Sequence, residues 1–250
     1  TTTVAQEQLV DYINSHIIDV LLVRSATKVR KDIIDSCPSL KIIGRGGVGM
    51  DNIDVDYARS KDIKVINTPA ASSASVAELV FAHLFGGVRF LYDSNRNMPL
   101  DGDSKFKELK KNYGRGRELR GKTLGIVGLG RIGKEVITRC LGFKMKVLGY
   151  DPFVNQEMFD SEKTIITDLK TLVQKSDYIS IHIPYNKETK NLFNYELLNL
   201  MKTNAFLINV ARGGIINEPD LALILSEEKI AGAAIDVFKQ EPVEKENPLL

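Results

Sequence analysis

The chain has 250 residues, 43% hydrophobic and 26% charged, the composition of an ordinary globular protein with one large domain or two smaller ones. Its 34 Lys and Arg against 32 Asp and Glu leave a net charge of +2, which gives no electrostatic case for nucleic acid or an anionic membrane as the main partner. No apolar run approaches the roughly 18 residues of a membrane span and no secretory signal is visible, so we expect a cytoplasmic protein.

The first third of the chain alternates short apolar runs with amphipathic stretches of helical length. We predict strands at 19–23, 40–43 and 64–66, with helices between them and a long helix over 75–89. This alternation is typical of βαβ units, whose parallel sheets are buried on both faces. We assign residues 1–93 to one α/β domain and expect its first strand to lie upstream of the chain.

Residues 94–120 are the least periodic stretch, and we place the linker between two domains there. The basic segment 105–122 also holds Glu108 and Glu118, so a solvated helix or a subunit-contact arm explains it better than a polyanion site. A second alternation then predicts another domain over 121–250. Its strands are expected at 123–127, 146–150, 178–183, 205–210 and 231–236, and its helices begin near Arg131, Asp168, Tyr195 and Glu218. The predicted fold class is α/β, with two doubly wound parallel-sheet domains.

The two cysteines, Cys37 and Cys140, lie far apart and match no metal or redox spacing. We expect both to be small buried side chains in a protein of a reducing compartment, and we predict no metal site.

Two stretches fit the pattern G-x-G-x-x-G, and their context distinguishes them. The second, 128–133, follows an apolar strand and opens an amphipathic helix, and Asp151 comes 18 residues after Gly133 at the end of the next strand. That spacing suits a dinucleotide, with the diphosphate at the helix N-terminus and the carboxylate on the adenosine ribose. Asp151 would repel a 2′-phosphate, which favours NAD over NADP. The expected contacts of this loop are Gly128, Gly130, Arg131, Ile132 and Gly133.

The first glycine loop, 44–49, has no such carboxylate, because the strand after it ends in Asn67-Thr68-Pro69. Successive amides around Gly46, Gly47 and Val48 could instead form a concavity for a small anion such as a carboxylate. Arg45 lies inside this loop and Arg24 ends the preceding strand, so the two guanidinium groups could converge at the same sheet edge. The alternative for each arginine is simple solvation at the surface.

Polar residues also follow the later strands. Arg212, in Asn209-Val210-Ala211-Arg212-Gly213-Gly214, could grip a substrate carboxylate through two hydrogen bonds at the edge that carries the cofactor loop. Asp236 and Glu241 end or follow the last strand. Taken singly, such acids are more often helix caps or solvated charges.

Together these residues resemble the D-2-hydroxyacid dehydrogenase family, over nearly the whole chain. The resemblance rests on 128–133, on 209–214, on 234–238 with Glu241-Pro242, and on His182-Ile183-Pro184 with Thr189. It implies a flavodoxin-like substrate domain and a Rossmann NAD-binding domain, with the active site in the cleft between them. Within the family, Val23-Arg24-Ser25-Ala26-Thr27, the segment 44–52, and Asn67-Thr68-Pro69 leading to Ser75-Val76-Ala77-Glu78 are similar to the branch that oxidises D-3-phosphoglycerate to 3-phosphohydroxypyruvate in serine biosynthesis.

The resemblance also implies roles for single residues. Arg212 would bind the substrate carboxylate, helped by the amides of Gly46 and Gly47, and Arg24 and Arg45 would take the phosphate of the substrate. Glu241 would orient a catalytic histidine and raise its pKa. The nicotinamide carboxamide would be held by Asp236, and the other expected cofactor contacts are Val48, Ile183, Pro184, Val210 and Ala211. The family implies a homodimer joined through the cofactor domain.

One departure concerns the catalytic histidine, which in the family follows the Glu-Pro segment. No histidine follows Glu241, and we expect none of His16, His83 and His182 to replace it. We expect the natural protein to be longer at both ends. If this were the whole polypeptide, it would bind the cofactor with very little turnover.

Two alternatives stay open at this point. The first is another enzyme of the same family, acting on glycerate, lactate or glyoxylate, for which Arg24→Ala would leave phosphoglycerate turnover unchanged. The second is a non-catalytic NAD sensor, like the corepressors of the family, which would form no reduced cofactor at any pH.

Overall fold

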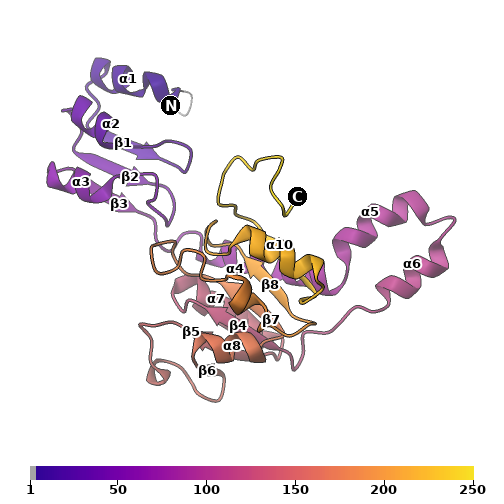
Figure 1. The fold of residues 1–250 in the computed structure, drawn as a ribbon. Helices are drawn as coiled ribbons and strands as arrows, with labels where there is room; N and C mark the ends of the chain where they lie inside the picture. Colours follow the sequence, from indigo (N-terminus) through magenta and orange to yellow (C-terminus); the bar gives the residue numbers. More distant parts are fainter. Residues whose placement is uncertain (1–3) are drawn as a thin grey trace. The chain divides into compact units, whose positions relative to one another are not determined.

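The computed structural model describes residues 4–250 (Figure 1). They form two compact units that divide after Ser73, and each unit is described by itself.

The first unit is a three-stranded parallel sheet in the order β1-β2-β3. Inward-facing Val23, Ile43 and Val65 pack with the helices in one apolar core. On the opposite face, Leu22 is 75% exposed and Ile66 is 46% exposed, so within the described residues the helices cover one face of this sheet. Its elements are η1 (Gln6–Gln8), α1 (Leu9–Ser15), β1 (Val20–Val23), α2 (Lys31–Ser36), β2 (Ile42–Arg45), α3 (Val55–Ser60) and β3 (Lys64–Asn67).

The second unit contains a six-stranded parallel sheet in the order β6-β5-β4-β7-β8-β9. Numbered along this unit, that is the order 3-2-1-4-5-6 of a dinucleotide-binding fold, with its topological switch point between β4 and β7. The strands are β4 (Thr123–Val127), β5 (Lys146–Tyr150), β6 (Thr164–Ile166), β7 (Tyr178–Ile181), β8 (Phe206–Asn209) and β9 (Gly232–Ile235). The helices are α4 (Ser73–Val88), α5 (Leu91–Asp101), α6 (Phe106–Tyr113), α7 (Arg131–Gly142), η2 (Gln156–Met158), α8 (Leu169–Lys175), α9 (Tyr195–Leu198) and α10 (Glu218–Ser226).

Helices bury both faces of this larger sheet. Apolar residues of α4 and α7 share one core with Ile126 and Ile208, and those of α8, α9 and α10 share another with Ile179 and Leu207. Successive residues of a strand point to opposite faces, so β4 supplies both cores: Leu124 and Ile126 belong to the first and Val127 to the second.

The predicted α/β class with parallel sheets is confirmed in both units. Every predicted strand is present, and β4 and β5 have the predicted bounds. The short edge strand β6 and the helix α5 were not predicted, whereas α6 lies in the basic segment 105–122, for which a solvated helix or a subunit-contact arm was expected. We expected the linker at 94–120, whereas the contacts divide the chain after Ser73, because α4 packs its apolar residues, from Ala77 to Val88, against the six-stranded sheet.

Helices α5 and α6, which we call the arm, form a hairpin that extends beyond the sheet of the second unit (Figure 1). No residue of α5 is buried, and α6 buries Leu109 alone. Within residues 4–250, no single helix has the length and apolar character to cross a membrane; α4 and α5 meet such a criterion when taken together, but they are bent by 50° at their junction.

Candidate functional site

The glycine loop after β4 has the geometry of a ligand cradle. Gly128 has φ +100°, and a side chain there would meet the backbone carbonyl of His182 at 2.5 Å. A Cβ on Gly133 would lie 2.2 Å from the carbonyl oxygen of Gly128, so the helix packs directly on the loop. Gly130 is different, because a Cβ there meets no atom within 4 Å. Gly128 and Gly133 are therefore required by the close packing of the loop itself, whereas Gly130 borders open space that a ligand can fill.

Helix α7 begins at this loop with its first amides available. Its N-cap is Gly130, which offers no side chain to accept a hydrogen bond, and the first turn of the described α7 contains no acidic residue. Neither the cap nor the first turn of the helix therefore supplies an anion to its amides and to the positive end of its dipole. A diphosphate supplies that anion, so the loop fits the diphosphate of a dinucleotide.

Asp151, at the end of β5, is bound to the same loop. Its Oδ2 accepts a hydrogen bond from the amide of Leu129 at 2.9 Å, and its Oδ1 accepts from the amide of Phe153 at 3.0 Å. Each carboxylate oxygen has a second lone pair, so a ribose hydroxyl can still donate to it. The carboxylate therefore shapes the loop and remains able to receive a sugar, which is the pairing predicted from the 18-residue spacing.

His182 follows β7 at the carboxyl edge of the sheet, beside Gly128. Its Nε2 lies 2.8 Å from Oγ of Ser180, and its Nδ1 is buried without a hydrogen-bond partner among the described residues. Burial lowers the pKa of His182 to about 4, so the ring is neutral near pH 7. A neutral buried ring suits a wall of the site better than an acid or a base. Ile183, which follows it, lies within 3.0 Å of the position of a Cβ on Gly128, and the next residue, Pro184, is exposed.

Arg212 is held in a tight turn after β8. Buried Asn209 builds that turn, because its Nδ2 donates to the carbonyl of Arg212 at 3.0 Å and its Oδ1 accepts from the amide of Ala211 at 3.1 Å. Arg212 itself is partly buried, and its Nη1 donates to the carbonyl of Ala211 at 2.7 Å. Just before the turn, Val210 is buried. The guanidinium is thus fixed at the carboxyl edge that carries the glycine loop.

The turn that holds Arg212 touches the segment after β9. A Cβ on Gly213 would lie 1.9 Å from the carbonyl oxygen of Phe238. Glu241 lies in that segment and is exposed; its Oε1 accepts from the amide of Phe238 at 3.1 Å, and no histidine is hydrogen bonded to it within residues 4–250. Asp236 is also exposed, and its amide donates to the carbonyl of Asn209. The structure therefore brings the segments of Arg212 and Glu241 together at one edge.

In the first unit, Arg24 and Arg45 line a single hollow of about 310 Å³. Nε of Arg45 donates to Oδ1 of Asn52 at 3.2 Å, and Nδ2 of Asn52 donates in turn to the carbonyls of Arg24 and Thr27. The two arginines predicted to converge thus lie together at the carboxyl ends of β1 and β2. The side chain of Arg24 makes no ion pair among the described residues.

The first glycine loop was expected to bind an anion through its backbone amides, but two of those amides are already hydrogen bonded inside the unit. The amide of Gly46 donates to the carbonyl of Val23 at 2.9 Å, and the amide of Gly47 donates to Oγ1 of Thr68 at 2.9 Å. Because both amides have acceptors inside the unit, a ligand here would rely on the arginine side chains. Val48 is 37% exposed, and its carbonyl accepts from Nδ2 of Asn67 at 2.7 Å.

Two organising residues were not identified from the sequence. Asn209 begins the motif 209–214, in which roles were predicted for other residues but none for Asn209. An asparagine at the end of an apolar strand and before a Gly-Gly pair could have indicated that its side-chain amide builds the turn. Glu218, at the start of α10, accepts from the amide of Lys239 and from Nδ2 of Asn247, and so holds the segment after β9. Among residues 4–250, no group of three or more His, Cys, Asp or Glu side chains could hold a metal ion. Both cysteines are free and buried, as predicted.

The strand order, the glycine loop and Asp151 together define a dinucleotide-binding Rossmann domain. Residues 81–250 match the family described as D-isomer specific 2-hydroxyacid dehydrogenase, NAD binding domain. The chain belongs to this family, and these residues form its NAD-binding domain.

Individual relatives agree with this assignment. The chain is 42% identical over 250 residues to a D-3-phosphoglycerate dehydrogenase of Methanocaldococcus jannaschii, covering 100% of this chain and 46% of the relative. It is 44% identical over 225 residues to a hydroxypyruvate reductase of Thermotoga maritima, covering 90% of this chain and 71% of the relative. The crystal structure of D-lactate dehydrogenase from Aquifex aeolicus complexed with NAD and lactic acid superposes with a TM-score of 0.76 at 34% identity, covering 96% of this chain and 69% of that one. The chain thus spans about half the length of the phosphoglycerate dehydrogenase relative.

Proposed function

We propose that this protein is an NAD-dependent oxidoreductase of D-2-hydroxy acids, and that its substrate is D-3-phosphoglycerate. The observation that carries the oxidoreductase proposal is the glycine loop, in which Gly130 borders open space beside free helix amides and Asp151. Phosphoglycerate is supported by the two arginines that share one hollow in the first unit. Relatives named D-3-phosphoglycerate dehydrogenase at about 40% identity support it too.

NAD bound in this loop supplies the acceptor for the hydride that leaves the carbinol carbon of the substrate. The amides of the first turn of α7 would bind the diphosphate, and Asp151 would bind the ribose. Arg212 would bind the substrate carboxylate with its planar guanidinium and polarise the reacting oxygen. In the first unit, Arg24 and Arg45 would bind a phosphate. Asp236 would hold the nicotinamide carboxamide, and Glu241 would orient the group that accepts the hydroxyl proton.

The test measures reduced cofactor by absorbance with the full-length protein, NAD and D-3-phosphoglycerate over a range of pH. We expect turnover, and we expect Arg24→Ala to raise KM for phosphoglycerate more than tenfold while the turnover of D-glycerate stays unchanged. Lys28→Ala, which removes an exposed charge four residues along the chain and outside the lining of the hollow, is the matched control. Equal KM values for Arg24→Ala and the wild type would contradict phosphate binding by Arg24, and no reduced cofactor with phosphoglycerate while another hydroxy acid is oxidised would contradict phosphoglycerate as substrate.

A non-catalytic NAD sensor is the second candidate. It is favoured by one observation, that Oε1 of Glu241 accepts a hydrogen bond from the amide of Phe238 within its own segment. NAD binding without reduced cofactor at any pH, for phosphoglycerate, glycerate, lactate and glyoxylate alike, would support the sensor and reject the enzyme.

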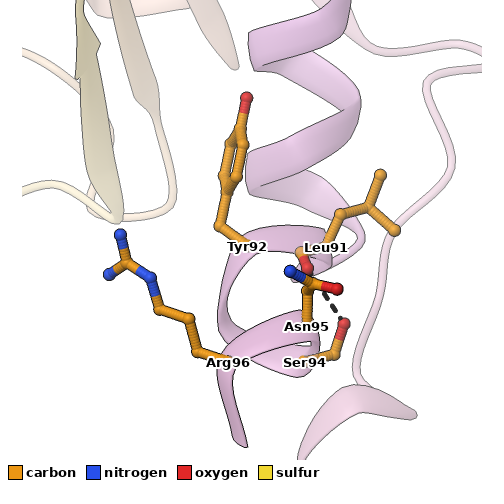
Figure 2. Close-up of a pocket in the computed structure, with 5 residues that line it drawn as sticks. All are labelled: Leu91, Tyr92, Ser94, Asn95 and Arg96. Carbon is orange, nitrogen blue, oxygen red and sulfur yellow. Dashed lines mark hydrogen bonds between the residues drawn. The ribbon is translucent and has the colours of Figure 1, made fainter. Parts of the chain in front are cut away.

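We also propose a homodimer formed through the second unit, with the arm as the contact surface. Five large apolar side chains of the arm are exposed, from 37% to 77%: Leu91, Tyr92, Met98, Leu100 and Phe106. Figure 2 shows Tyr92 and Arg96 toward one side of α5 and Leu91 and Ser94 toward the other; together with Asn95 they line a hollow. A Cβ on Gly86 would meet the Tyr92 ring at 2.3 Å, so the ring packs on the backbone of α4. Such a concentration of exposed apolar groups is typical of a protein contact.

Sedimentation equilibrium tests this contact. Leu100→Glu with Phe106→Glu should convert a dimer into a monomer, whereas Ile17→Glu, at an equally exposed apolar residue of the first unit, should leave the dimer intact. A wild-type chain that sediments as a monomer would reject the dimer. The proposed compartment is the cytoplasm, in agreement with two free thiols.

A further inference from the structure

A second hollow of the second unit, of about 330 Å³, lies at the edge of the six-stranded sheet opposite the glycine loop. Leu119 and Arg120 precede β4, and the segment 142–144 precedes β5. Because parallel strands share their direction, these residues lie at the amino edge, whereas Gly128 and Asp151 follow the same strands at the carboxyl edge. The five residues of β4 span about 17 Å between the edges. The hollow is therefore separate from the cofactor loop.

The lining of this amino-edge hollow is strongly basic. It contains one acid, Glu118, and four cations, which are Arg89, Arg117, Arg120 and Lys144. Within residues 4–250, none of the four forms a salt bridge, and Nη1 of Arg117 donates to the carbonyl of Asn204 at 3.3 Å.

Two helices, α4 and α7, also end at this hollow, and their C-termini each contribute about half a negative charge. Four cations minus one carboxylate give +3, and the two helix ends reduce this to about +2. The basic side chains therefore exceed what the helix dipoles require. The excess is available to an anion.

An exposed aromatic wall stands beside these cations. Phe143 is 42% exposed; its ring packs edge-on against Phe85 with centroids 5.2 Å apart and at a tilt of 38° against Phe81 with centroids 5.3 Å apart. These contacts hold the ring, and the exposed Phe143 lines the hollow. A fixed aromatic face can stack with a flat ring, while neighbouring guanidinium groups bind phosphate oxygens in pairs.

We propose that the amino-edge hollow binds a small phosphorylated molecule with a flat ring, of the class of nucleoside phosphates. The ring stacks on Phe143, and the phosphates pair with Arg120, Lys144 and the neighbouring arginines. This site is independent of the NAD-binding loop and of the proposed substrate.

Isothermal titration of the chain with GTP, inorganic tripolyphosphate and guanosine, with NAD at saturation, tests the proposal. GTP should bind several-fold more tightly than tripolyphosphate, and guanosine should not bind. Arg120→Gln with Lys144→Gln should weaken both phosphate ligands at least tenfold. Phe143→Ala should reduce the affinity for GTP to that for tripolyphosphate. The matched control, Lys170→Gln with Lys229→Gln, removes two exposed charges elsewhere in the second unit and should change neither affinity.

Three results would overturn the proposal. The first is a wild-type chain that binds neither GTP nor tripolyphosphate. The second is loss of GTP binding in Gly130→Ala, which would assign the nucleotide to the cofactor loop. The third is a pair of results: GTP does not bind the wild type, and Phe143→Ala changes the protein from dimer to monomer in sedimentation. Together they would make the hollow a subunit contact.

Discussion

Adding one methyl group to the glycine loop separates cofactor binding from folding. At Gly130 the backbone has φ −69°, which alanine adopts without strain, and a Cβ meets no atom within 4 Å. Replacing glycine by alanine at a compatible position stabilises by about 0.4–1 kcal/mol through the unfolded chain, and alanine is a poorer N-cap than glycine by roughly 0.5–1 kcal/mol, so the two effects nearly cancel. Gly130→Ala should therefore leave the stability of the second unit nearly unchanged.

The same methyl group fills space that the dinucleotide diphosphate needs. We expect Gly130→Ala to weaken NADH binding at least tenfold, which corresponds to about 1.4 kcal/mol. Gly133→Ala is the matched variant, because its Cβ would lie 2.2 Å from the carbonyl oxygen of Gly128. The loop or the helix must move, at a cost of roughly 1–3 kcal/mol of stability, and NADH affinity falls with it.

The assay titrates the chain into NADH and follows the fluorescence of the reduced nicotinamide. The chain contains no Trp, so the protein adds no tryptophan signal. Thermal unfolding of both variants is measured in parallel. If Gly130→Ala binds NADH as tightly as the wild type while retaining its melting temperature, the diphosphate does not lie against Gly130, and the argument from open space fails.

Three further predictions concern single side chains. Burial lowers the pKa of His182 to about 4, from 6.5 in the unfolded chain. The free energy of unfolding should therefore fall by roughly 3 kcal/mol as the pH decreases from about 6.5 to about 4. Urea unfolding at a series of pH values measures this fall, which should be absent in His182→Gln. Glu228 has a left-handed backbone conformation, with φ +54°, just after α10, so Glu228→Gly should raise the free energy of unfolding by about 1 kcal/mol. An unchanged melting temperature would show that this conformation carries no strain in the wild type. Burial raises the pKa of Cys140 to about 12 and also raises that of Cys37, so at pH 8 a thiol reagent counted by mass spectrometry should modify neither in the folded chain.

The sequence was most informative where several requirements act on the same residues. β4 and β5 are buried parallel strands, so their apolar runs end where the polar loops begin, and their bounds were predicted correctly. The glycine loop could be identified because the fold and the ligand both need small residues at fixed spacing. Asp151 followed from that spacing.

Elements with little burial left little trace in the sequence. β6 is a three-residue edge strand in which Ile165 is 54% exposed, so the run is too short and too open to distinguish. α5 contains Pro99 and buries no residue, so it lacks the apolar periodicity by which helices are recognised. The acceptors of the Gly46 and Gly47 amides depend on Val23 and Thr68, which are distant in the chain, and no local pattern predicts such contacts.

Because of its two roles, Asp151 couples the choice between NAD and NADP to the structure of the glycine loop. The oxygens proposed to meet the ribose already accept the amides of Leu129 and Phe153, so a mutation that makes room for a 2′-phosphate also removes one hydrogen bond to the glycine loop and one to the turn after β5. A change of preference from NAD to NADP would need a compensating substitution that supplies new acceptors.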